Sequence, residues 1–263
     1  MADGHVSGAT PPADSPAPGG HIRTPFRLSR PQKLFVVLAA IFLTALVVAE
    51  ATASKFFSAF TLPFTFSLWG FETTSVVMTT GVIAFPITFI VTDLINEYYG
   101  RAGIRFLSYV GAAMIVFEFA LVRIGMALPT ADGSPVSGEA FDMVFGASQR
   151  VIFGSLTAFL LGQLLDIALF FRLRQLTKGR HLWLRATGST LGSQFFDTAI
   201  VLSIAFWGQI PAGQIAAITL FNYGYKLVIA IGITPLIYAG HRLMDRYLGD
   251  HLAGTMIDAA DDA

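Results

Sequence analysis

The stretch "FPITFIVTDLINEYYG", residues 85–100, decides the fold because it begins as apolar helix sequence and ends in polar side chains. Asp93, Asn96 and Glu97 follow one another at spacings that place all three on one face of a helix. A charged side chain at bilayer depth costs about 2.5 to 3.5 kcal/mol on insertion scales, so such residues usually face the interior of a helix bundle. The stretch therefore predicts a membrane helix with one polar face, and Pro86 on the same stripe predicts a kink in it.

The composition agrees with a membrane protein. Of the 263 residues, 54% are apolar and only 13% are charged, and the mean hydropathy is +0.64. Such values lie far from those of an ordinary soluble domain. The 17 basic and 17 acidic residues balance, so no basic surface argues for direct nucleic-acid binding. The absence of cysteine excludes thiolate metal sites and cysteine nucleophiles, and no cofactor or metal is predicted.

Six windows are long and apolar enough to cross a bilayer, which takes about 20 residues. They are residues 33–54, 74–98, 104–127, 150–172, 187–208 and 215–240. The sequence therefore predicts an all-α, polytopic membrane protein with six transmembrane helices.

The charges between these windows predict the orientation. Thirteen Lys and Arg residues lie before the first window, in the second-to-third and fourth-to-fifth connections, and after the last window, against two in the other connections. By the positive-inside rule, both termini then lie in the cytoplasm. The chain itself is expected in the cell inner membrane. We expect a disordered cytoplasmic tail over 1–32, a transporter domain over 33–245 and a short cytoplasmic tail over 246–263.

Further polar residues lie inside the later windows. Gln163 and Asp166 lie in the fourth, Gln194 and Asp197 in the fifth, and Lys226 in the sixth. Burial of an ammonium at this depth costs the least free energy when a carboxylate lies beside it. Lys226 is therefore expected to pair with one of these acids. Gln can also hold helices together without touching a ligand, so a packing role stays open.

Two acids have a plainer alternative. Glu97 can lie at the cytoplasmic interface, solvated and paired with Arg101. Glu118 stands alone among apolar neighbours in the third window, so a structural role is as reasonable as a site role.

Four long motifs carry a resemblance to a known family. They are residues 85–100, "GQLLDIALFFRLRQLT" at 162–177, "LWLRATGSTLGSQFFDTAIVLSIAFWG" at 182–208 and "YKLVIAIGITPLIY" at 225–238. With these motifs the chain resembles the queuosine precursor transporter family, formerly described as a vitamin uptake family, over residues 33–245. The resemblance implies a six-helix membrane protein that takes up 7-cyano-7-deazaguanine or a relative for the queuosine modification of transfer RNA.

A 7-deazaguanine presents adjacent N–H donors, a carbonyl acceptor and a flat aromatic face. A carboxylate can accept both N–H groups, an amide can serve the carbonyl or ring nitrogens, and a cation can donate to the carbonyl. The residues expected to bind the substrate are Asp93, Asn96, Glu97, Gln163, Asp166, Arg185, Gln194, Asp197 and Lys226.

The expected function is import of the deazapurine by a secondary carrier in the lipid bilayer. The alternative is a substrate-binding membrane subunit of an energy-coupling-factor type ATP-driven importer, and a homo-oligomer is left open. An intramembrane enzyme is the least favoured class, because the sequence has no H-E-x-x-H or G-x-S-x-G motif and no cysteine.

Overall fold

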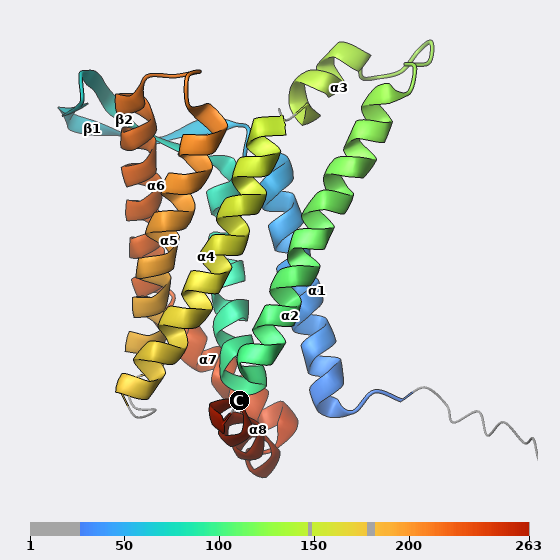
Figure 1. Ribbon diagram of the computed structural model, residues 1–263, viewed down its shortest axis with the longest axis vertical. Helices are drawn as coiled ribbons and strands as arrows, with labels where there is room; N and C mark the ends of the chain where they lie inside the picture. Colours follow the sequence, from blue (N-terminus) through green and yellow to red (C-terminus); the bar gives the residue numbers. More distant parts are fainter. Residues whose placement is uncertain (1–26, 147–148, 178–181, 263) are drawn as a thin grey trace, which may run out of the picture.

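The computed structural model describes residues 27–146, 149–177 and 182–262, and it is mostly helical (Figure 1). In chain order the elements are α1 (Arg30–Thr52), β1 (Phe56–Leu68), β2 (Phe71–Thr79), the 3-10 helix η1 (Thr80–Ala84), α2 (Phe85–Ala127), α3 (Gly138–Phe145), α4 (Gln149–Leu176), α5 (Leu182–Phe206), α6 (Ala212–Gly232), α7 (Thr234–Leu248) and α8 (Asp250–Asp262). The long helices run roughly along one axis and form a bundle (Figure 1).

Four helices of the described chain are long and apolar enough to cross a membrane. They are α1, the continuous stretch Thr80–Ala127, the Gly154–Leu176 part of α4, and α6, and a shorter apolar run covers Gly192–Phe206 of α5. Both ends of the described chain lie at the end of the bundle that carries α8 (Figure 1). The protein is therefore a multi-span membrane protein, while six spans and the cytoplasmic placement of both termini stay predictions.

The helix α2 contains a sharp reversal at Gly100, where φ is 64° and ψ is −165°. Its first segment, residues 85–99, runs toward α8, and its second segment, residues 101–127, runs back along the bundle (Figure 1). This backbone conformation is essentially restricted to glycine. A Cβ at this position would also lie 3.1 Å from the Cα of Ala260 in α8, so glycine permits both the reversal and the packing of α8 against it.

The expectation of an all-α fold is wrong at one place. The strands β1 and β2 pair in an antiparallel hairpin, with Leu68 opposite Phe71 and a two-residue turn at Trp69 and Gly70. Both turn residues have positive φ, 49° and 78°, which is the conformation of a type I′ hairpin turn. The predicted window 74–98 is therefore wrong over its first part, because Thr and Val side chains there favour strands.

Two prolines mark helix starts that differ from those of the predicted windows. Pro86 lies in the first turn of α2, so it starts the helix and does not kink it. Pro235 lies in the first turn of α7, and the window 215–240 is accordingly split between α6 and α7 at Ile233. Proline fits at both positions because the first turn needs no donor from that nitrogen.

A large hydrophobic cluster fills the bundle toward α8. It combines buried side chains of α1, both segments of α2, α4, α7 and α8, among them Phe42, Tyr98, Ile104, Phe170 and Met244. Since the described side chains of α5 and α6 contribute nothing to this cluster, their polar inner faces are available to line a cavity on the other side of it.

Candidate functional site

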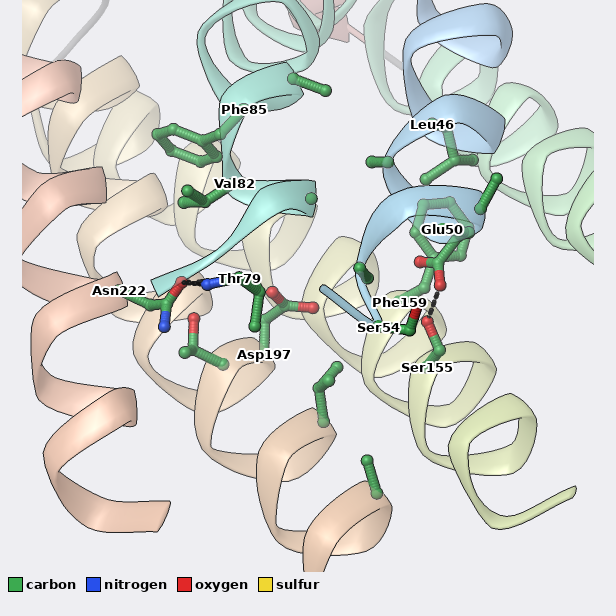
Figure 2. A pocket seen from close by; sticks show the side chains of 18 of the residues that line it. Leu46, Glu50, Ser54, Thr79, Val82, Phe85, Ser155, Phe159, Asp197 and Asn222 are labelled. Carbon is green, nitrogen blue, oxygen red and sulfur yellow. Dashed lines mark hydrogen bonds between the residues drawn. The ribbon is translucent and has the colours of Figure 1, made fainter. Parts of the chain in front are cut away.

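A cavity of about 280 Å³ lies inside the bundle (Figure 2). Its walls come from α1, both segments of α2, α4, α5 and α6. It extends from Lys226 and Gln194 to Phe145 in α3 and Phe206 at the end of α5, so it reaches the end of the bundle that carries α3 and the hairpin (Figure 1). We refer to this cavity as the central pocket.

The Lys226 ammonium organises one wall of the central pocket. Its Nζ donates to Oε1 of Gln194 at 2.7 Å and to Oδ2 of Asp197 at 3.0 Å. The third donation goes to Oγ1 of Thr198, also at 3.0 Å. An ammonium has three donors and all three are used, which offsets the cost of placing the charge inside the bundle. The expected pairing of Lys226 with a carboxylate is confirmed.

Two further polar contacts face the same space. In Figure 2 the Glu50 carboxylate of α1 accepts a hydrogen bond from the Ser155 hydroxyl of α4. On the other side, the Asn222 Oδ1 accepts from the backbone N–H of Thr79 at 3.4 Å. The Asp197 carboxylate projects from α5 into the pocket between these two contacts (Figure 2). Polar groups therefore converge on the cavity from α1, α4, α5, α6 and β2.

Most of the remaining lining is apolar and aromatic, and Ser54, Thr88 and Glu118 are its further polar members. The ring of Phe85 lies 5.4 Å from the Lys226 Nζ, within the range of a cation–π contact. Phe119, Phe159 and Phe206 line other walls. A pocket lined by aromatic side chains with a few convergent polar groups is the usual form of a site for a small planar molecule.

Close packing of α4 on α5 fixes the position of Asp197. A Cβ added at Gly162 would lie 3.1 Å from the Asp197 Cβ and 3.2 Å from its Oδ1. Any side chain at 162 would thus displace the carboxylate, and glycine lets the two helices approach closely enough to hold it in place.

The chemistry of the central pocket is recognition by hydrogen bonds, charge and stacking. The pocket offers carboxylates, an amide and an ammonium beside an aromatic ring. In the described ranges, 27–146, 149–177 and 182–262, no group of three or more His, Asp or Glu residues gathers in a way that could hold a metal ion. The arrangement suits a small molecule with both donors and acceptors.

The polar stripe of the first segment of α2 lies outside the central pocket. Asp93, Asn96 and Glu97 are all buried, with relative exposures of 3%, 1% and 7%, but none of them lines the cavity. Oδ2 of Asp93 lies 3.5 Å from Nε2 of His241 in α7. Asp93 therefore meets α7 and not the pocket, and substrate contact by Asp93, Asn96 and Glu97 stays a prediction.

Asp166, another predicted site residue, also lies outside the central pocket. Asp166 of α4 is buried and accepts a hydrogen bond from the Ser193 hydroxyl of α5 at 3.1 Å, outside the pocket lining. The side chains of Gln163 and Arg185 lie outside the described part of the structure. Of the nine predicted residues, the structure brings three together at the pocket, namely Gln194, Asp197 and Lys226.

Several residues of the site were not predicted from the sequence. Glu50 is an acid near the end of an otherwise apolar helix, which is the same signal that pointed to Asp93. Asn222 precedes Lys226 by four residues and shares its helix face, so the periodicity of α6 could have identified it. Ser155 and Thr198 carry no such signal, because hydroxyls often bond back to their own helix, as Thr198 also does to the Gln194 carbonyl.

Comparison with known proteins identifies the family of the chain. Residues 79–240 match the family model described as "Putative vitamin uptake transporter". A Bacillus subtilis protein named "Probable queuosine precursor transporter" is 34% identical over 167 residues, 63% of this chain and 72% of its own length. The Escherichia coli protein named "Queuosine precursor transporter" is 32% identical over 168 residues, 63% of this chain and 71% of its own. No solved structure matches the chain. The chain therefore belongs to this family, and it is a membrane transporter and not an enzyme.

Proposed function

We propose that the chain imports a queuosine precursor, 7-cyano-7-deazaguanine or a related 7-deazaguanine, for transfer RNA modification, and that it works as a secondary carrier. The observation that carries this proposal is the meeting of Gln194, Asp197 and Lys226 beside the Phe85 ring in the central pocket. The names of the relatives supply the substrate class.

The residues of the pocket are complementary to such a ring. A carboxylate accepts two adjacent N–H groups, and Asp197 is the acid that the substrate's guanidine-like edge would take as its partner. Lys226 would then turn from Asp197 toward the substrate carbonyl, while Gln194 offers both a donor and an acceptor. Stacking on Phe85 would add about 1 to 3 kcal/mol, by analogy with base stacking on aromatic side chains.

The buried residues outside the pocket fit a role in the transport cycle. The central pocket reaches the end of the bundle with α3, whereas the hydrophobic cluster fills the bundle toward α8. Release on that second side requires α7 to move away from the first segment of α2. The Asp93–His241 contact joins these two elements, so we propose that Asp93 acts in the conformational change and not in substrate contact. Asn96 and Glu97 lie on the same helix face as Asp93, and we assign them the same role. The hydrogen bond from Ser193 to Asp166 keeps α4 and α5 together.

Uptake in cells tests the proposal. A strain that cannot synthesise queuosine precursors would be given radiolabelled 7-cyano-7-deazaguanine, its 7-aminomethyl analogue or queuine, with and without this gene. We expect accumulation of at least one base that depends on the gene and is lost in Asp197→Asn. Glu72→Gln, which removes an exposed acid of the hairpin, is the matched control and should transport normally.

Two results would contradict the proposal. Uptake of none of the three bases by a protein that is present in the membrane would remove the substrate class. Uptake that appears only when an ATPase partner is co-expressed, and that co-purifies with it, would favour the energy-coupling-factor alternative over a secondary carrier.

A further inference from the structure

A second cavity, of about 240 Å³, lies between the second segment of α2 and the last part of α4. Its lining consists of Arg101, Arg105, Leu164, Ile167, Ala168, Arg172 and Gln175. It shares no lining residue with the central pocket. Gly100, which precedes Arg101, lies beside α8, so this cavity is at the end of the bundle that carries α8 (Figure 1).

Three guanidinium groups meet at this cavity without a protein acid to balance them. Within the described residues none of the three arginines forms an ion pair, and no Asp or Glu lines the cavity. Arg101 and Arg105 are four residues apart on one helix face, where like charges destabilise a helix by about 0.2 to 0.5 kcal/mol. Arg172 from α4 adds a third charge to the same space. The cavity is therefore a site that an anion would stabilise.

One of the three groups is held in a defined place. The Cζ atom of Arg101 lies 4.6 Å from the centroid of the Phe171 ring, a cation–π contact that fixes the guanidinium over α4. Planar guanidinium groups bind phosphate oxygens through two parallel hydrogen bonds, which makes arginine the preferred partner of phosphate.

The cavity is also polar at one end and apolar at the other. Leu164 precedes Arg172 by eight residues on α4, about 12 Å along a helix at 1.5 Å per residue. Its side chain is 42% exposed, on the outside of the bundle, and the exposed Ala168, one turn further along α4, continues the apolar wall. An amphiphile would place a charged headgroup at the arginines and an acyl chain along this wall. A free phosphate ion would leave the wall unused.

We propose that this second cavity binds the phosphate headgroup of an anionic phospholipid, with an acyl chain against Leu164 and Ala168. Basic cavities between membrane helices near one face of the bilayer are suited to such headgroups. The proposal does not depend on the identity of the transported substrate.

Lipid retention measured by native mass spectrometry tests the proposal. The purified full-length protein would be exchanged into nanodiscs that contain equal amounts of phosphatidylglycerol and phosphatidylcholine, and then released for measurement. We expect the wild type to retain phosphatidylglycerol over phosphatidylcholine by at least about tenfold, equivalent to about 1.4 kcal/mol. Arg105→Gln with Arg172→Gln should abolish this preference. Arg242→Gln with Arg246→Gln is the control, because it also removes two exposed arginines but leaves the cavity intact.

A second measurement needs no variant. Phosphatidylglycerol added to the delipidated wild-type protein should raise its thermal midpoint, and phosphatidylcholine should not. An equal rise with both lipids, or an equal loss of preference in the control variant, would overturn the assignment. Inorganic phosphate that displaces the retained lipid, or that raises the midpoint by itself, would show a site for free phosphate and overturn the lipid assignment as well.

Discussion

At the scale of single residues, the account depends on the ammonium of Lys226. Its three donations, to Gln194, Asp197 and Thr198, connect α6 to α5 at the wall of the central pocket. The same contacts would hold the substrate-binding groups in position before the substrate arrives. The same atoms therefore form a structural ion pair and a substrate-binding site. A single substitution would affect both the stability of the protein and the binding of the substrate.

A pair of substitutions separates the two roles. Lys226→Met leaves the Asp197 carboxylate without its cation, and the loss of one partner of a buried ion pair destabilises a protein by about 3 to 5 kcal/mol. Lys226→Met combined with Asp197→Asn removes both charges, so we expect its thermal midpoint to return toward that of the wild type. Its uptake should stay at least about tenfold below wild type, a loss of about 1.4 kcal/mol. Recovery of both the midpoint and uptake in the double variant would mean that the pair is structural only.

At the scale of helices and strands, the reversal at Gly100 and the position of α7 decide how the bundle closes toward α8. Tyr98 donates a hydrogen bond to Oδ1 of Asp245 at 2.6 Å, and the Asp93–His241 contact lies on the same pair of elements. Together these contacts hold α7 against the first segment of α2. Helix α8 packs on the reversal itself, with Ala260 beside Gly100.

Removal of one hydroxyl should loosen α7. Tyr98→Phe deletes the hydrogen bond to Asp245, and a hydrogen bond to a charged group contributes about 1.5 to 3 kcal/mol. We expect faster hydrogen–deuterium exchange in α7, measured by mass spectrometry. Tyr109→Phe, at a position that is 61% exposed, is the matched control and should leave the exchange in α7 unchanged. Equal exchange in both variants would show that Tyr98 does not hold α7.

A methyl group at the reversal should also destabilise the protein. Gly100→Ala places a side chain in a conformation that costs about 1 to 3 kcal/mol for residues other than glycine. The Cβ would in addition press on α8. Gly254→Ala in α8 is the control, since no atom lies within 4 Å of the position where its Cβ would be. The thermal midpoint should fall for Gly100→Ala only, and equal midpoints would contradict the role assigned to Gly100.

The membrane helices were predictable from the sequence wherever an apolar stretch is long enough, as a helix, to cross the bilayer. The hairpin was not, because the end of β2 was taken into the window 74–98, where Val side chains are apolar enough to extend a membrane window and also favour strands. The polar stripe of Asp93, Asn96 and Glu97 was correctly predicted to be buried, since periodicity shows which residues share a face. Periodicity does not show which neighbour that face meets. Here Asp93 meets His241 of α7, and none of the three residues lines the pocket. Two helices bring together Gln194, Asp197 and Lys226. The pairing of Lys226 with an acid was predictable, because a lone buried charge is costly.

At the scale of the whole molecule, both described ends of the chain lie at the α8 end of the bundle (Figure 1). The same end carries Arg101, Arg105 and Arg172 around the second cavity. By the positive-inside rule this end is expected in the cytoplasm, and the central pocket would then open to the outside.

A topology reporter tests this orientation. An enzyme that is active only outside the cytoplasm, fused after Ala263, should be silent. The same enzyme inserted at Gly133, in the exposed connection before α3, should be active, because that connection is at the opposite end. Strong activity of the fusion after Ala263 would reverse the orientation and place the central pocket toward the cytoplasm.

Equilibrium binding of radiolabelled 7-cyano-7-deazaguanine to the purified protein shows whether the pocket at Asp197 is the substrate site. We expect Asp197→Asn to weaken binding at least about tenfold, whereas Asp93→Asn should stay within about twofold of wild type because Asp93 lies outside the pocket. Glu72→Gln controls for the loss of an acid. Wild-type affinity in Asp197→Asn, together with loss of binding in Asp93→Asn, would contradict the account and move the substrate site to the interface of α2 and α7.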